Sequence, residues 1–440
     1  MSGGLLAALM FPALFALIFL GIPVSFSLAG VAFLFGIGVF GDVIGAVFYD
    51  RLLGVSTAST LAAVPLFVFM GAVLERSAIA ERLFRVMQVW FGFMPGGLGI
   101  AAITMSAVFA AATGIIGAVE AVIGMMAIPA MMKLGYDRGL ISGTICAGGS
   151  LGTIIPPSIV VIIYASLAEL SIGALFAGIM IPGGLMVALF ILYIAGRAWL
   201  RPQDGPPAPR EVYAIPLRQK LVVTVQGLVP AVLLVAAVLG AILGGIASPT
   251  ESASVGAVGA MLLTLLYREF SLKVLRESLT KTLTVTAMVM MIVVGGTMFS
   301  SVFLVIGGGS LIRDTVASLQ LGPAGMVALF LFIVFLLGFV LDWITVVLIC
   351  LPIFLPLLRG AGVDQIWFAV MMTVVIQTAY LTPPMAPAVF YLRTIAPPEI
   401  TYRDMYLGVA PFVALEAIVL AIVALVPATA TYLPSVLIGF

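Results

Sequence analysis

Two short motifs place a pair of adjacent prolines within long apolar segments of this chain. The first is GGSLGTIIPPS at 148–158, and the second is QTAYLTPPM at 377–385. Because proline lacks an amide hydrogen, each pair leaves facing carbonyl groups without helical donors, and these oxygens are free to coordinate a cation. Hydroxyl oxygens lie close to both breaks: Ser150, Thr153, Ser158, Thr378 and Thr382. A simple proline kink is the alternative interpretation of either motif taken alone.

Four carboxylates also fall within apolar segments, where their burial is costly and therefore points to function. Asp342 is expected at the tip of a helical hairpin and is the strongest candidate for cation contact. Glu120, just beyond a second such tip, is a candidate for substrate contact or for taking up a proton. Glu251, in the sequence SPTES, is predicted to cap a helix. Glu416 is predicted to pack against a polar neighbour.

The composition requires a bilayer around the protein. Of 440 residues, 63% are hydrophobic and only 8% are charged, whereas soluble domains carry about 25% charged residues. Histidine is absent, which removes the commonest general base and metal ligand. The net charge of +1 gives no basic surface for nucleic acid. Cys146 and Cys350 lie in apolar runs and are predicted to be small buried hydrophobes.

The lengths of the apolar segments indicate the elements that position these residues. A membrane helix needs about 20 apolar residues, and most segments fit one or two crossings. Residues 97–132 and 323–358 are too long for one crossing and too short for two with a turn. Re-entrant hairpins fit this length, with tips near Thr113-Gly114 and Leu341-Asp342. A long tilted helix is the alternative. The apolar start of the chain, 1–20, is predicted to be a retained span.

The two halves of the chain match at a nearly constant offset. An offset of 227 superposes the two proline pairs, and an offset of 226 superposes Pro23 on Pro249. The predicted fold is an all-α polytopic membrane protein with a first repeat at 1–200, a linker at 201–220 and a second repeat at 221–440. Each repeat has five crossings, which predicts an inverted topology. The predicted broken helices cover about 139–168 and 365–395.

The basic residues support this topology. If the arginine-rich linker is cytoplasmic, sixteen of the 19 basic residues fall on that side, and only Arg51, Arg313 and Arg359 fall outside. Both termini are then expected outside the membrane. Residues 75–90 and 268–281 are charged and amphipathic, which suits helices along the cytoplasmic interface. Solvated loops are the alternative for these two segments.

Over essentially its whole length, the chain resembles the large membrane subunit of tripartite ATP-independent periplasmic (TRAP) transporters, in the wider ion-transporter superfamily. The most specific matches are GSLGTIIPPS at 149–158, ASPTESA at 247–253 and LTPP at 381–384. The resemblance implies an elevator-type carrier in the bacterial inner membrane, with periplasmic termini, driven by sodium and importing small organic anions such as carboxylates. It implies two partners, a small membrane subunit and a periplasmic substrate-binding protein, and no cofactor besides the coupling sodium ions.

The resemblance implies sodium sites in the stretches 113–117, 149–153 and 378–382, and the hairpin tips and proline pairs themselves supply the other candidate residues. The sodium-binding candidates are Thr113, Gly114, Gly117, Gly149, Ser150, Gly152, Thr153, Asp342, Thr345, Thr378, Ala379 and Thr382. The substrate-binding candidates are Glu120, Pro156, Pro157, Ser158, Pro383, Pro384, Met385 and Arg393. The chain departs from the family pattern at 112–118, where ATGIIGA replaces a serine-rich tip, and at Tyr380, where a glycine usually precedes the proline motif.

Other functions are compatible with parts of this pattern. A stand-alone sodium–carboxylate symporter of the same superfamily shares the repeat but needs no binding protein. A channel is a third possibility, which strict coupling of solute flux to sodium excludes. A membrane-embedded enzyme would need catalytic groups, and the sequence offers neither histidine nor a close carboxylate cluster. The chain is therefore not expected to be an enzyme.

Overall fold

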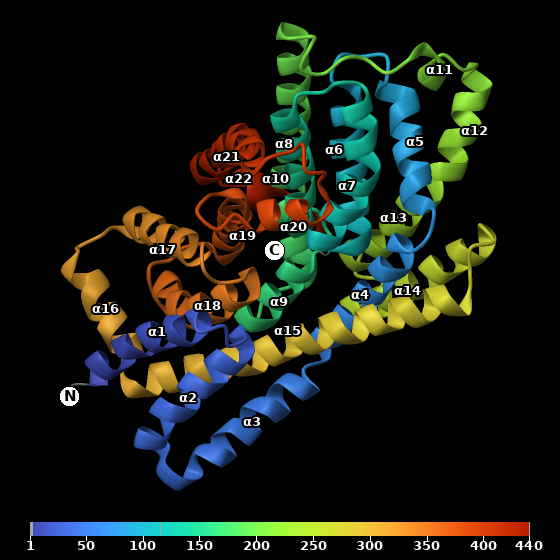
Figure 1. Cartoon of the computed structure of the whole chain (residues 1–440). Coiled ribbons are helices and arrows are strands. Elements are labelled where there is room, and N and C mark those ends of the chain that lie inside the picture. Colours follow the sequence, from blue (N-terminus) through green and yellow to red (C-terminus); the bar gives the residue numbers. More distant parts are fainter. Residues whose placement is uncertain (1–2, 115, 440) are drawn as a thin grey trace.

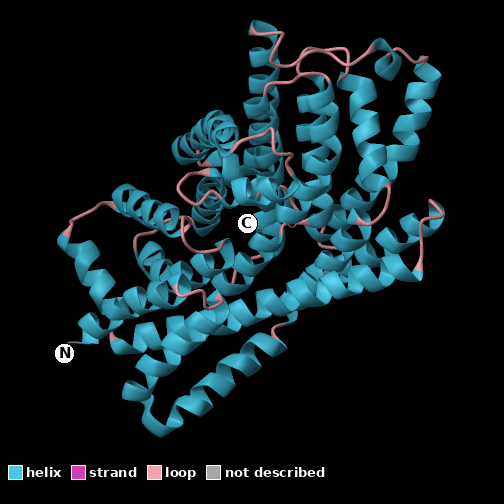
Figure 2. Cartoon of the chain, in the orientation of Figure 1, coloured by secondary structure: helices cyan, strands magenta, loops and turns pink. Residues whose placement is uncertain are grey.

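The computed structural model describes residues 3–114 and 116–439, and within these ranges the chain is helical, with loops and turns but no strands (Figure 2). This agrees with the composition, because a helix satisfies its backbone hydrogen bonds internally where no water is present. Six helical stretches among the described residues are long and apolar enough to cross a membrane. The number rises to eight if each of two bent helix pairs counts as one span. The chain is a multi-pass membrane protein.

One group of helices forms an elongated frame around α15 (Leu272–Ile306), the longest helix, which runs along one side of the molecule (Figure 1). Its 35 residues correspond to about 52 Å. Helices α2 and α4 pack directly on it, and α14 packs on α4. The helices of this frame group are α1 (Gly3–Phe19), α2 (Val24–Phe40), α3 (Ile44–Thr57), α4 (Ala63–Glu75), α5 (Ile79–Phe91), α12 (Leu217–Gly227), α13 (Val229–Leu243), α14 (Pro249–Leu266), α15 and α16 (Gly308–Ser318).

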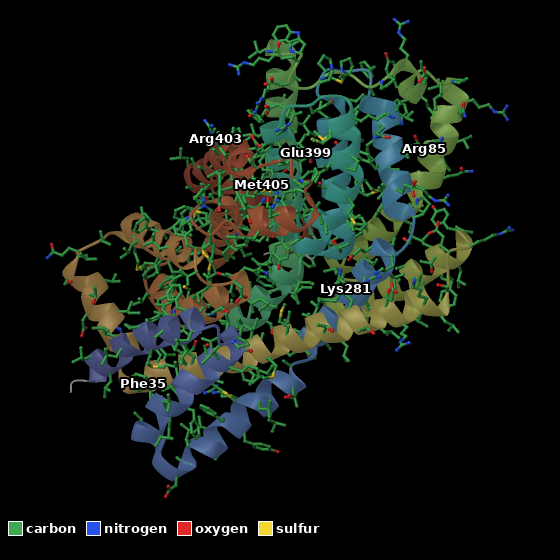
Figure 3. The ribbon with its side chains drawn as sticks, in the orientation of Figure 1. Phe35, Arg85, Lys281, Glu399, Arg403 and Met405 are labelled. Atoms are coloured by element: carbon green, nitrogen blue, oxygen red, sulfur yellow. The ribbon has the colours of Figure 1, made fainter. Side chains whose placement is uncertain are left out.

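Both charged, amphipathic stretches of the frame contain helix, and one of them continues into a longer helix. Residues 79–91 do form a separate helix, α5, after a sharp bend from α4. Residues 272–281 instead form the first turns of α15, since Ser271 caps the helix and neither proline nor glycine interrupts it before Gly295. Ion pairs hold this end of α15 against α4: Lys281 with Glu75, and Arg76 with Glu277. Figure 3 shows Lys281 on α15 beside α4.

The remaining helices form a second group, here called the hairpin group, which repeats one order of elements twice. Each copy has a helical hairpin, a helix that breaks at a proline pair, and a long helix. The first copy comprises α6 (Gly97–Thr113), α7 (Ile116–Lys133), α8 (Arg138–Ser150), α9 (Ile159–Ala168) and α10 (Ile172–Leu200). The second comprises α17 (Pro323–Leu337), α18 (Trp343–Gly360), α19 (Gln365–Leu381), α20 (Pro387–Ile395) and α21 (Tyr402–Leu425), followed by α22 (Ala428–Leu437).

The turns of both hairpins fall where the segment lengths predict them. Helix α6 ends at Thr113, and Gly114 follows with a φ of +60°, a conformation that glycine adopts without strain. In the second hairpin, α17 ends at Leu337 and Asp342 caps the start of α18. The midpoints near 113–114 and 341–342 are thus confirmed as turn positions. That the hairpins re-enter the membrane remains a prediction.

The linker between the halves is fastened to the hairpin group. It contains the short helix α11 (Arg210–Tyr213), and its backbone bonds to the ends of neighbouring elements, with Gly96 N donating to Gly205 O at 2.7 Å. Arg197, near the end of α10, donates to Asp137 at 2.8 Å and to Asp204 in the linker at 3.0 Å. The linker therefore bonds first to the hairpin group and then to the end of α5 in the frame group, where Ala208 N donates to Gly92 O at 2.8 Å.

Candidate functional site

A cavity of ≈ 430 Å³ lies where the two helix groups meet. Its hairpin-group side contains the tips of both hairpins, with Gly114 and Gly117 from the first and Asp342 from the second. Its frame side contains the start of α2 and an apolar face of α15, which comprises Val285, Met288, Val289 and Ile292. The broken part of the second copy adds Tyr380, Pro387 and Tyr391. Volumes of 300–1,000 Å³ are typical of small-molecule sites.

The first hairpin tip touches both broken helices. A side chain on Gly114 would lie 3.1 Å from the carbonyl oxygen of Pro157, the second proline of the first pair. A side chain on Gly117 would lie 3.0 Å from the ring of Tyr391 on α20. Glycine at both positions thus permits a close approach between this tip and the two proline breaks.

The second hairpin tip is organised by Asp342, the N-cap of α18. Its Oδ2 accepts hydrogen bonds from the backbone of Ile344 at 3.0 Å and of Thr345 at 3.3 Å. Its Oδ1 accepts a hydrogen bond from the Thr345 hydroxyl at 2.5 Å. Asp342 thus stabilises the start of α18 while lining the cavity. Asp342 thus lies at the turn of the second hairpin, as predicted, and its contact with a cation stays a prediction.

A buried polar network joins the two broken helices. The Gln377 amide nitrogen donates to the Ser150 hydroxyl at 2.9 Å, and the Thr153 hydroxyl donates to the Gln377 carbonyl oxygen at 3.2 Å. Ser150 also donates to Glu416 on α21 at 3.3 Å, so this glutamate has the polar neighbour that the sequence predicts. All four side chains are fully buried. Ser150 and Gln377 are separated by 227 residues, the repeat offset, so equivalent positions of the two copies meet here.

Glu120 lies on the opposite side of the same break. It is fully buried, and its Oε2 accepts a hydrogen bond from the Tyr380 hydroxyl at 3.4 Å. Gly149 passes directly beside it, because a side chain there would lie 2.7 Å from Cβ of Glu120. The break at Gly149-Ser150 is therefore flanked by one buried carboxyl on each side, Glu120 and Glu416.

Four of the predicted hydroxyl ligands form a hydrogen bond to a backbone carbonyl a few residues before them in the chain. Each donates its proton to a backbone carbonyl: Thr113 to Phe109 at 3.1 Å, Ser158 to Thr153 at 2.7 Å, Thr378 to Val374 at 2.9 Å and Thr382 to Thr378 at 2.6 Å. Their oxygen lone pairs remain available to a cation. Gly152 and Ala379 are buried beside the same breaks.

The candidate residues therefore separate into an open set and a buried set. Gly114, Gly117 and Asp342 line the cavity, whereas Ser150 and Thr153 belong to the buried network. Met385, next to Pro383-Pro384, is 44% exposed and is not among the lining residues. Both proline pairs, Pro156-Pro157 and Pro383-Pro384, contain a cis peptide bond.

Arg393 points away from the cavity. Its guanidinium donates to the carbonyl of Ile400 at 2.9 Å and lies 5.6 Å from the centre of the Tyr402 ring. It therefore stabilises the loop between α20 and α21, and it is not among the residues that line the cavity. The sequence placed it nearest to the second motif, but the direction of the side chain depends on this loop.

Three residues of the site were not predicted, because their contacts are with residues far away in the sequence. Gln377 belongs to the second motif, and its match to Ser150 under the offset of 227 was the available signal. Tyr391 was not singled out, and nothing local in the sequence marks it. Met186 on α10 contributes its sulfur to the amide of Gln377 at 2.9 Å, and no sequence feature predicts this contact.

The oxygen-rich breaks fit a hard cation such as sodium, for which oxygen ligands are suited. Two buried carboxylate oxygens, Oε1 of Glu120 and Oε2 of Glu416, lack a hydrogen-bond partner within the described part of the chain.

Among the described residues, no group of three or more His, Cys, Asp or Glu side chains forms a transition-metal site. Cys146 and Cys350 are buried, as predicted. Ser248 and Glu251 form the predicted capping box of α14.

The comparisons with known proteins identify one family. The model for the tripartite ATP-independent periplasmic transporter, DctM component, matches residues 11–429. The C4-dicarboxylate TRAP transporter large permease protein DctM of Pseudomonas aeruginosa is 30% identical over 390 residues, which is 88% of each chain. The ectoine/5-hydroxyectoine TRAP transporter large permease protein UehC of Ruegeria pomeroyi is 30% identical over 411 residues, or 93% of this chain and 94% of that one.

Solved structures support the fold. The YdaH transporter of Alcanivorax borkumensis has a TM-score of 0.59 at 14% identity, covering 89% of this chain and 88% of that chain. MtrF of Neisseria gonorrhoeae, from a class of antimetabolite efflux pumps, has a TM-score of 0.57 at 11% identity, with 88% and 85% covered. At such identities the likeness concerns the helical fold alone.

Proposed function

The chain belongs to the DctM family of TRAP transporters, and we propose that it is the large permease of a sodium-coupled importer of small organic acids. Its relatives are membrane transporters, and the chain is not an enzyme. Their names include C4-dicarboxylates, sialic acid and ectoine, so the acid differs between members. The observation that carries the proposal is the cavity between both hairpin tips, beside the oxygen-rich proline breaks.

Sodium ions and the acid have separate places in this proposal. Sodium is held by oxygens at the breaks, with Ser150, Thr153 and Glu416 around the buried network and Asp342 at the second tip. The acid occupies the cavity. The start of α9 faces the cavity with Ile159 and Val160 and has no side-chain cap, so its backbone amides favour the carboxylate of the acid.

The position of the cavity supports an elevator-type movement. One wall belongs to the hairpin group, and the opposite wall is the apolar face of α15. An apolar wall makes no directional hydrogen bonds, so the hairpin group can slide along it without breaking any. In this proposal the two copies have inverted topology, the hairpins re-enter the membrane, and the hairpin group carries acid and sodium across together.

The proposed assembly has two partners in the inner membrane and periplasm. These are a small membrane subunit, which binds the frame group, and a periplasmic binding protein that delivers the acid. One relative, the isethionate TRAP transporter permease protein DctMQ of Oleidesulfovibrio alaskensis, is named as a combined protein, of which this chain covers 56%. Both termini of the present chain are proposed to be periplasmic.

Reconstitution in proteoliposomes tests the proposal. Uptake of acid is expected only with an inward sodium gradient and with both partners present, and it should disappear when sodium is replaced by potassium. Asp342→Ala and Thr153→Ala should raise the sodium concentration for half-maximal uptake, whereas Thr104→Ala, whose hydroxyl bonds within α6, should not. Uptake by this chain alone would favour a stand-alone symporter, and sodium-independent uptake would refute the coupling.

A further inference from the structure

The charge of the cavity restricts the acid that it can hold. Among the described residues that line it, Asp342 is the one with a formal charge, and none is a lysine or arginine. A dicarboxylate would therefore meet a wall of its own sign, with sodium ions as its main counter-charge. Like charges in a low-dielectric site repel strongly, so this arrangement does not fit a dianion well.

Two tyrosines form an aromatic surface on the hairpin-group side. The rings of Tyr380 and Tyr391 stack with centres 6.5 Å apart and planes at 28°. The Tyr391 ring lies over Gly117, and 52% of the residue is exposed, so part of this ring is open to an occupant of the cavity. Trp343 lines the cavity next to Asp342. Aromatic faces carry partial negative charge and attract organic cations, most of all when water is excluded.

Two carboxyl groups belong to the surroundings of this aromatic surface, because Asp342 lines the same cavity and Glu120 contacts Tyr380. The Tyr380 hydroxyl donates to Glu120 at 3.4 Å. A phenol that donates to a carboxylate becomes richer in electrons, which strengthens the attraction of its ring for a cation. The surface thus presents negative potential to its occupant.

The nearest basic side chain does not reverse this potential. Arg393, on the same helix as Tyr391, directs its guanidinium to Ile400 O and Tyr402. On the opposite wall, Val285, Met288 and Ile292 of α15 are uncharged. The cavity consequently has an electronegative aromatic side and an apolar side, a combination that selects an organic cation.

From these features we infer that the transported acid is zwitterionic. It carries a positively charged nitrogen group, quaternary or delocalised, besides its carboxylate. Tyr391 and Tyr380 receive the positive end, and the carboxylate faces the start of α9 and the sodium ions. The inference rests on the proposed function, since it assumes that this cavity holds the transported acid.

Binding to the purified full-length chain in detergent with sodium tests this inference. The probes are carboxylates in matched pairs, with and without a cationic nitrogen, such as proline betaine and cyclopentanecarboxylate, together with succinate. The carboxylates with a cationic nitrogen are expected to raise the unfolding temperature of the chain, and their partners without nitrogen are not. A panel that yields no binder, or binders only among acids without nitrogen, overturns the inference.

Substitutions at Tyr391 separate ring recognition from general disturbance. Tyr391→Leu should weaken binding of the zwitterion about tenfold, which corresponds to the loss of a partly desolvated cation–π contact. Tyr391→Phe keeps the ring and should stay within about twofold. Tyr432→Leu removes an exposed tyrosine of α22 outside the cavity and should have no effect. Equal binding by Tyr391→Leu and the unaltered chain would contradict the assignment.

Different results would refute the proposed transport function and the inferred zwitterionic substrate. If sodium drives uptake of a dicarboxylate in proteoliposomes, the proposed function stands and the inference about the substrate falls. If zwitterions bind but sodium drives no uptake of any acid, the inference about the cavity stands and the transport function falls.

Discussion

Replacing Ser150 and Gln377, singly and together, measures how strongly the two broken helices are joined. The residues occupy equivalent positions of the two copies, and the Gln377 amide donates to the Ser150 hydroxyl at 2.9 Å in a fully buried environment. Ser150→Ala removes the acceptor, and Gln377→Leu removes the donor while keeping a side chain of similar size. A double-mutant cycle then isolates the energy of this pair from the other contacts of either residue.

The expected coupling follows from hydrogen bonds between membrane helices, which average about 0.6 kcal/mol and reach about 1.7 kcal/mol. The pair is buried and its donor–acceptor distance of 2.9 Å is typical of a good hydrogen bond, so a coupling energy in the upper half of this range is expected. Gln377→Leu alone should cost more, because it also leaves the Thr153 hydroxyl without its contact at 3.2 Å. The Met186 sulfur loses its contact as well.

Equilibrium unfolding of the purified chain in detergent micelles provides the free energies. A matched control is Ser142→Ala, on the same helix, whose buried hydroxyl bonds only to Arg138 O at 2.8 Å. Combined with Gln377→Leu it should be additive within about 0.5 kcal/mol. If the Ser150 pair were equally additive, the contact would contribute no stability and the reasoning would be refuted.

Two further predictions concern stability. Gly149→Ala should destabilise the chain by about 1–3 kcal/mol, since its Cβ would lie 2.7 Å from Glu120 Cβ, whereas Gly30→Ala in α2 has open space and should not; thermal unfolding of both variants decides the matter. Ser248→Ala should cost about 1 kcal/mol by removing the capping box of α14. Ser254→Ala, on the same helix, is its control, and equal unfolding midpoints would contradict the role of the cap.

The breaks and hairpin turns were predictable because they depend on local chemistry. Proline pairs remove backbone donors wherever they occur, so helices had to end near Pro156 and Pro383. The 36-residue apolar segments were likewise predicted to turn near their midpoints, with a long tilted helix as the alternative, and they turn at Gly114 and before Asp342. The cap at Ser248 follows from a three-residue spacing.

The composition of the cavity was not predictable in the same way. Tyr391 reaches Gly117 across 274 positions of sequence, and the pairing of Ser150 with Gln377 depends on how the two copies pack. Arg393 was expected near the substrate, but the loop after α20 directs it to Ile400. Residues 272–281 are helical, as expected for an interfacial helix, but they continue without a break into the rest of α15, and their place at the interface stays a prediction.

The apolar face of α15 has an electrical consequence for a carrier of this kind. A membrane potential of 100 mV drives each elementary charge with about 2.3 kcal/mol. In the proposed sodium-coupled mechanism, a water-filled gap beside the cavity would therefore let sodium cross the membrane without the transported acid. Val285, Met288, Val289 and Ile292 offer such an ion no oxygen to replace its hydration shell. The wall therefore acts as an electrical insulator. Polar substitutions along it should let sodium leak and dissipate its gradient before they weaken binding of the acid.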